Sequence, residues 1–134
     1  MQFKQIWANF PVLDTARTES FYSQLGLTPN MPKATPELAS FIFGDNKLII
    51  HFFRRDKLEA SMGDKAIEPG NGSEIIFSIS AKTEEEVGNW ANNATLAGGT
   101  VITKAGRQPD GYYYCVFADP DGHKFNVLLL EQGM

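Results

Sequence analysis

Two side chains in this sequence have the chemistry for acid–base catalysis. His51 lies within the apolar run Leu48–Phe53, which is typical of a β-strand, and Glu74 stands at the start of a later strand-like segment. A carboxylate beside an imidazole raises the pKa of the imidazole and makes a proton-transfer pair. His51 and Glu74 are therefore the candidate catalytic residues. The alternatives are a partly buried structural histidine with a satisfied hydrogen bond and a solvated glutamate at a strand start.

The other reactive side chains favour structural roles. Cys115 is the only cysteine, so no intramolecular disulfide is possible. It lies in the apolar run Tyr112–Phe117 without a neighbouring base, which is typical of a small core residue and not of a nucleophile. His123 directly follows the turn Asp119–Gly122, and we expect it to be a turn residue at the edge of a sheet.

The composition indicates a folded domain with its own core and argues against nucleic acid as a partner. Of the 134 residues, 43% are hydrophobic, and the net charge is −4. Phosphate binding needs a basic face, whereas the only adjacent basic pair is Arg54–Arg55, which we interpret as part of a surface turn. No apolar stretch approaches the roughly 20 residues that span a bilayer. The N-terminus does not resemble a signal peptide, so we expect a cytoplasmic protein without membrane contact.

The first half of the chain predicts a strand, a helix and a hairpin. Residues 3–12 are rich in aromatic and β-branched side chains, and Asp14 is a good N-cap for a helix over residues 15–25. Two further strands, at 38–43 and 47–53, are separated by a short turn and form the predicted hairpin.

The second half repeats this order. Residues 74–80 alternate like a strand, and Thr83 forms a capping box with Glu86 at the start of a predicted helix. Three more strands are predicted, at 100–104, 112–118 and 124–130.

The repeated order predicts one α+β domain. We expect two βαβββ modules, residues 1–53 and 73–134, whose curved mixed sheets surround a cleft and carry the helices on their outer faces. The polar segment 54–72 shows no clear period and is predicted to be a linker or a lid.

Two motifs resemble the glyoxalase/bleomycin-resistance/extradiol-dioxygenase superfamily, also named vicinal oxygen chelate. Phe21–Leu27 is similar to its "FY…LG" helix end, and Phe117–Val127 is similar to its late "DPDG" hairpin. Within the superfamily the chain most resembles small bacterial predicted lactoylglutathione lyase-like proteins, and Asn9–Val12 adds to that likeness. The resemblance implies the two-module fold over nearly the whole chain and a homodimer.

Metal-using members of the superfamily present one ligand, usually histidine or glutamate, from each of four strands. Carried over by position, these ligands fall on Trp7, on Glu74, on Asn126 and on His51, or on Ile50 if the register slips by one residue. An indole does not hold such a metal, and an amide is a weak ligand for it. At best two strong ligands remain, fewer than the three of a catalytic zinc site. We therefore expect no metal and no other resident cofactor.

The altered positions suit ligand binding. Trp7 would make the floor of the cleft flat and apolar, which favours a planar ligand, although core packing is the alternative. Asn9 and Asn126 are polar candidates for substrate binding. In the run of three tyrosines, alternation places Tyr113 opposite its neighbours, and Tyr114 is our candidate for the cleft.

Two functions compete. The first is a metal-free protein that binds a small organic or aromatic molecule in the cleft, as bleomycin-resistance relatives do. The second is a lyase or isomerase acting on a small carbonyl compound or thiol adduct, with His51 and Glu74 transferring protons. Nothing specific supports a purely structural dimer. In either case the expected partner is a small organic molecule.

Overall fold

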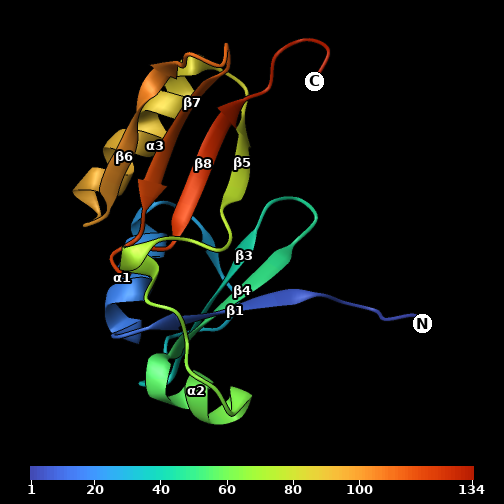
Figure 1. Ribbon diagram of the computed structural model, residues 1–134, viewed down its shortest axis with the longest axis vertical. Helices are drawn as coiled ribbons and strands as arrows, with labels where there is room; N and C mark the ends of the chain where they lie inside the picture. The colour runs from blue at the N-terminus through green and yellow to red at the C-terminus, as the bar shows by residue number, and fades with distance from the viewer. The chain divides into compact units, whose positions relative to one another are not determined.

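The chain folds as two compact units, unit 1 (Met1–Ile67) and unit 2 (Glu68–Met134). The computed structural model describes the backbone of residues 1–134 and every side chain except that of Pro69. Each unit forms its own four-stranded mixed sheet, with a helix that follows the first strand (Figure 1). The predicted α+β class with helices and mixed sheets in repeated order is confirmed.

Unit 1 begins with a strand that is shorter than predicted. Its elements are β1 (Trp7–Val12), α1 (Thr15–Gln24), β2 (Thr28–Pro29), β3 (Leu38–Phe43), β4 (Leu48–Arg54) and α2 (Arg55–Met62). The strand order is β1-β4-β3-β2, with β1 parallel to β4 and the other pairs antiparallel. The strand predicted from residue 3 starts at Trp7, because pairing with β4 starts at the Trp7–Ile49 pair.

The ends of α1 are set by local chemistry. The carboxylate of Asp14 accepts hydrogen bonds from the backbone N–H groups of Ala16 at 2.9 Å and Arg17 at 3.2 Å, which confirms the predicted N-cap. After the helix, Gly26 has a φ of 83°, a left-handed conformation that favours glycine. The N–H of Leu27 then donates to a carbonyl of the last turn at 3.1 Å and closes the helix.

One face of the unit 1 sheet packs against α1. The Phe21 and Tyr22 side chains of α1 are fully buried, and the ring of Tyr22 stacks on Phe52 of β4 with 4.7 Å between centroids. Ile50 and Phe52 are also buried, and each such apolar side chain contributes about 1.5–3 kcal/mol when removed from water. Because side chains alternate along a strand, His51 points to the opposite face.

The segment predicted as a linker or a lid contains a helix, which the sequence analysis did not predict. Helix α2 packs against β1 and β4, and it buries Leu58. The guanidinium of Arg55 donates to the backbone carbonyl of Ala66 at 2.9 Å and holds the segment after the helix. The sequence signal is weak because α2 buries little apolar surface, and none of the described side chains caps its start.

Unit 2 repeats the topology. Its elements are η1 (Pro69–Asn71), β5 (Phe77–Ala81), α3 (Glu84–Leu96), β6 (Thr100–Arg107), β7 (Tyr113–Ala118) and β8 (Lys124–Leu129). The strand order is β5-β8-β7-β6, with β5 parallel to β8. The strand predicted from Glu74 starts at Phe77, where pairing with β8 begins, so Glu74 lies outside the sheet. Strand β6 continues three residues past the predicted end at 104, to 107.

Helix α3 has the predicted cap in a slightly different form. The hydroxyl of Thr83 accepts from the N–H of Glu86 at 3.1 Å. The Glu86 carboxylate accepts from the N–H of Lys82 at 2.7 Å, one residue before the N-cap. The helix covers one face of the sheet, and the Cys115 thiol of β7 reaches the carbonyl of Val87 across that interface at 3.6 Å.

Cys115 and His123 are both buried. Cys115 is fully buried, and burial raises the pKa of its thiol to about 11. His123 is buried after the turn, and its backbone N–H donates to the carboxylate of Asp119 at 2.9 Å. Among the described helices, none is long and apolar enough to cross a bilayer.

Candidate functional site

His51 lies on the face of the unit 1 sheet opposite α1. In the sheet it stands between Asn9 of β1 and Ser40 of β3. The ring of Trp7 meets it edge-on with 6.3 Å between centroids, and the ring of Phe53 meets it in the same way at 5.7 Å. We call this surface, formed by Trp7, Asn9, Ser40, His51 and Phe53, the His51 face. It brings together three of the predicted site residues, Trp7, Asn9 and His51.

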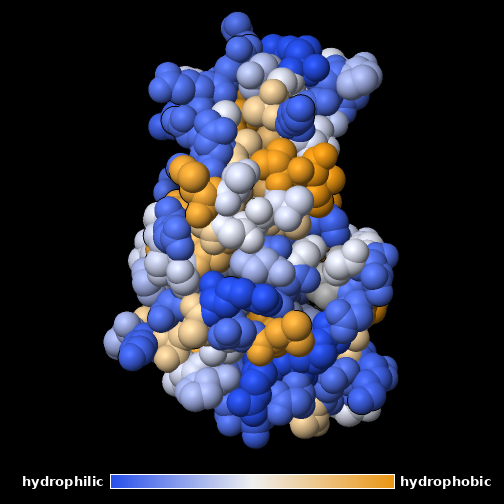
Figure 2. Space-filling view, turned by 90° about the vertical axis from the view of Figure 1, so that its left-hand side faces the viewer, coloured by the Kyte–Doolittle hydropathy of each residue, from blue (hydrophilic) through white to orange (hydrophobic). Residues whose placement is uncertain are grey.

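The His51 face keeps part of its aromatic surface in solvent. Trp7 is 49% exposed, so it is not a core residue beneath a helix, and Asn9 is exposed beside it. Other large apolar side chains also reach the surface, and Figure 2 shows hydrophobic groups on one side of the molecule between hydrophilic ones. A contiguous exposed apolar patch is typical of a surface that contacts a ligand or a partner, whereas single exposed apolar side chains are normal.

Two polar residues that sequence reasoning missed hold the imidazole of His51. The Ser40 hydroxyl oxygen lies 2.8 Å from His51 Nδ1, and the Asn30 side-chain amide donates to the same oxygen at 3.1 Å. Ser40 is buried, so its hydroxyl proton needs an acceptor. The Ser40 hydroxyl, which accepts from Asn30, can donate to His51 Nδ1, and in that arrangement the imidazole proton lies on Nε2. His51 is then a hydrogen-bond donor at Nε2.

The environment of His51 favours its neutral form. Burial lowers the pKa of its imidazole below the ordinary value of about 6.5. A paired carboxylate would have raised that pKa, as the predicted pair with Glu74 requires. Glu74 is exposed and precedes β5 in unit 2, whereas His51 belongs to unit 1. The pairing of His51 with Glu74 stays a prediction.

The sheet of unit 2 carries a pocket of about 490 Å³. Its polar and aromatic lining consists of Asp110, Tyr112, Tyr114 and Asn126. Its apolar lining consists of Ile76, Val116, Leu128 and Met134. The predicted residues Tyr114 and Asn126 thus lie in one pocket. Tyr113 is absent from the lining and instead has the guanidinium of Arg107 5.5 Å from its ring centre, as strand alternation predicts.

The polar groups of this pocket are unevenly satisfied. The Tyr114 hydroxyl donates to the Asp110 carboxylate at 3.1 Å, and this bond raises the pKa of the phenol. The Asn126 amide nitrogen donates to the hydroxyl of Ser78 at 3.2 Å. The Asn126 carbonyl oxygen, Oδ1, is buried and has no hydrogen-bond partner among the described residues. A buried acceptor without a donor costs about 1–3 kcal/mol.

His51 and Asn126 occupy equivalent places in the two units. His51 stands beside Asn9, six residues before α1 begins at residue 15, and Asn126 stands beside Ser78, six residues before α3 begins at residue 84. Trp7 lies eight residues before α1 begins. The residue eight positions before α3 begins is Ile76, and not Glu74. The four equivalent positions therefore carry an indole, an imidazole, an aliphatic side chain and an amide.

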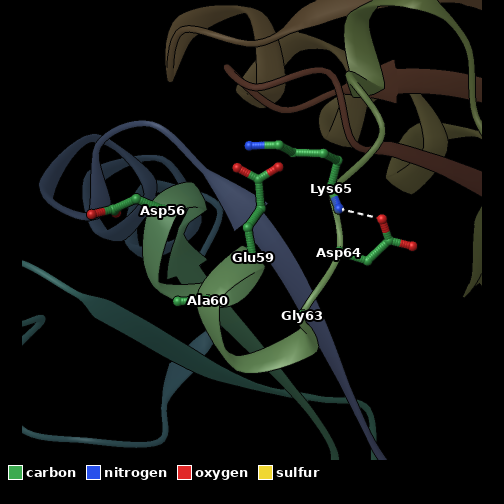
Figure 3. A pocket seen from close by; sticks show the side chains of 6 residues that line it. All are labelled: Asp56, Glu59, Ala60, Gly63, Asp64 and Lys65. Atoms are coloured by element: carbon green, nitrogen blue, oxygen red, sulfur yellow. Dashed lines mark hydrogen bonds between the residues drawn. The ribbon is translucent and has the colours of Figure 1, made fainter.

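A second hollow, also of about 490 Å³, lies along α2 and the segment after it (Figure 3). Its carboxylates already have partners within unit 1. Asp56 pairs with Arg54 at 2.7 Å, and the Glu59 carboxylate accepts from the N–H of Ala66 at 2.9 Å. The Asp64 carboxylate accepts from the N–H of Lys65 at 2.8 Å (Figure 3). Because these carboxylates are paired locally, we interpret the hollow as a part of the connection after α2 and not as a ligand site.

A model of the Glyoxalase/Bleomycin resistance protein/Dioxygenase superfamily matches residues 4–127. The chain belongs to this superfamily. A comparison with curated proteins finds no significant match. Of the four equivalent positions, only His51 carries a strong metal ligand. Among the described residues, no group of three or more His, Cys, Asp or Glu side chains is placed to hold an ion.

Several solved structures share the fold at low sequence identity. A hypothetical protein from S. aureus is 24% identical, with 97% of this chain and 96% of that chain covered and a TM-score of 0.84. A bleomycin-binding protein complexed with bleomycin is 20% identical, with 96% and 100% covered and a TM-score of 0.59. A lactoylglutathione lyase from Agrobacterium tumefaciens is 21% identical, with 96% of each chain covered and a TM-score of 0.62. At these identities the likeness concerns the fold.

Proposed function

We propose that the protein binds a small organic or aromatic molecule and needs no metal ion to do so. The observation that carries the proposal is the buried, unpartnered Oδ1 of Asn126 in a pocket that also contains Tyr114. Small-molecule sites are concave and mostly apolar, with few polar groups that orient the ligand. The unit 2 pocket has this composition, and its volume of about 490 Å³ suits a small molecule.

The His51 face of unit 1 is the second proposed contact surface. The exposed Trp7 indole offers a flat apolar ring, and Asn9 offers an amide beside it. His51 Nε2 adds a donor for a ligand carbonyl or hydroxyl oxygen. A structural relative complexed with bleomycin supports small-molecule binding by this fold. From the superfamily resemblance we also expect a homodimer, which light scattering of the purified protein would test.

A titration of metal-stripped protein tests the proposed binding. We would add a panel of small aromatic compounds in the presence of EDTA and follow the NMR signals of the tyrosine side chains. Tyr114→Ala should weaken binding, because the side chain lines the pocket. Tyr113→Ala is the matched control, because the Tyr113 side chain lies on the other face of β7, beside Arg107. If no compound binds, or if both variants weaken binding equally, the proposal is wrong.

A lyase or isomerase acting on a small carbonyl compound or thiol adduct is the second candidate function. It is favoured by the fixed imidazole of His51, whose Nε2–H could donate to a developing oxyanion. Metal analysis of the purified protein and an assay with the hemithioacetal of methylglyoxal and glutathione distinguish the two. Stoichiometric nickel, zinc, iron or manganese together with activity would favour the enzyme. A metal-free, inactive protein that binds aromatic compounds would favour the first proposal.

A further inference from the structure

The unit 2 pocket has one charged side chain among its described lining residues, and its charge is negative. Asp110 is the only charged residue among the described residues that line it. Its carboxylate is held in place by the N–H of Tyr112 at 3.0 Å and by the hydroxyl of Tyr114 at 3.1 Å. Two neutral donors do not cancel the charge, so an anionic ligand would be repelled here without a compensating cation.

The other polar and aromatic groups in the pocket also suit a ligand that is positively charged and donates hydrogen bonds. The Oδ1 atom of Asn126 accepts and has no partner among the described residues. Tyr112 and Tyr114 contribute aromatic rings, whose faces attract cations. The hydroxyl of Tyr114 is already committed to Asp110, and this bond reduces its value as a donor to a ligand. The aliphatic lining from Val116 and Leu128 leaves room for an apolar body.

We propose that the unit 2 pocket selects a protonated amine carried on an apolar or aromatic body. The ammonium group would lie near Asp110 and the tyrosine rings, and an N–H of the ligand would donate to Asn126 Oδ1. This inference rests on the proposed function and deepens it by naming the ligand class. A preference for amines would also distinguish this protein from one that binds an anionic thiol adduct.

Three probes with the same phenylethyl body and different charge test the inference on the full chain. They are 2-phenylethylammonium, the neutral 2-phenylethanol and the anionic 3-phenylpropanoate, each titrated at pH 7 and followed by NMR. The ammonium probe should bind at least about tenfold more tightly than the anionic probe, as expected for a cation between a carboxylate and aromatic rings. Binding should shift the side-chain amide signals of Asn126.

Variants at Asp110 isolate the contribution of the charge. Asp110→Asn should weaken ammonium binding by about fivefold or more and leave 2-phenylethanol binding within about twofold, in the range of a partly exposed charge pair. Asp110→Glu keeps the charge and should retain the preference for the cation. Asp64→Asn, in the other unit, is the control for the net charge and should change neither affinity. Thermal unfolding of each variant verifies that it is folded.

The possible failures are distinguishable. Equal or tighter binding of the anionic probe, or a cation preference that survives Asp110→Asn, would overturn the amine inference and leave small-molecule binding intact. If none of the three probes binds, the amine inference and the proposed role of the pocket both fail.

Discussion

The hydroxyl oxygen of Ser40 lies 2.8 Å from Nδ1 of His51, across the β3–β4 pair. Since the Asn30 amide donates to the same hydroxyl, we predict that the resting imidazole carries its proton on Nε2. Long-range ¹H–¹⁵N spectra of the histidine rings at pH 7.5 distinguish the two tautomers. His123 gives the second set of signals, which His123→Gln removes.

Ser40→Ala should loosen this arrangement, because it removes the donor to Nδ1. We expect the His51 signals to shift toward a mixture of tautomers, while Ser78→Ala leaves them unchanged. Ser78 is the matched control, since it accepts from Asn126 on the equivalent sheet face of unit 2. A His51 ring protonated on Nδ1 in the unaltered protein would contradict the assignment.

The lowered pKa of His51 predicts a pH dependence of stability. Burial lowers this pKa, so the unfolded chain takes up a proton at a higher pH than the folded chain does. The neutral imidazole therefore contributes fully above pH about 6.5, and its contribution is lost as the pH falls through the lower, folded-state value. Urea unfolding at pH 7.5 and pH 5.0 should show a larger loss for the unaltered protein than for His51→Gln. A larger loss in the variant would contradict this sign.

Much of the fold follows from local signals in the sequence, whereas the site depends on pairing between distant residues. The Asp14 and Thr83 caps act within one helical turn, so both helix starts were predicted correctly. Helix α2 was missed because its stability comes from Leu58 packing and from the Arg55 bonds to residues after it. Tertiary packing and not intrinsic propensity explains such a helix.

The residues around His51, and the equivalent of Trp7 in unit 2, likewise depend on contacts that local sequence signals do not reveal. Ser40 was readable in principle, because a hairpin with strands at 38–43 and 47–53 places it opposite His51. Asn30 meets Ser40 from an irregular segment, and no periodicity indicates that contact. The residue equivalent to Trp7 in unit 2, Ile76, became clear only from the start of α3 and the register of β5, neither of which the superfamily likeness provides.

Cys115 should be unreactive in the folded protein. It is fully buried, and burial raises its thiol pKa to about 11, so almost no thiolate forms at neutral pH. We expect no measurable labelling by iodoacetamide at pH 8 over an hour and complete labelling in guanidinium chloride. Rapid labelling without denaturant would mean that β7 or α3 opens readily.

The two tryptophans should report ligand binding differently. Trp7 is half exposed beside His51, whereas Trp90 stacks on Phe117 with 6.0 Å between ring centres. Trp7→Ala should weaken binding of an aromatic ligand by more than about 1 kcal/mol, the usual value of an aromatic contact. Binding at the His51 face should change the fluorescence of Trp90→Phe, which retains Trp7, but not that of Trp7→Phe. The reverse pattern would place the ligand away from the His51 face.

The side-chain amide of Asn126 tests the central claim most directly. In the metal-stripped protein, its NMR signals should shift on titration with small aromatic probes and saturate, because Oδ1 gains the donor that it lacks. The same titration with Asn126→Leu should show clearly weaker binding. Signals that stay unchanged with every probe, or that respond only after a transition metal ion is restored, would contradict a metal-free ligand site in unit 2.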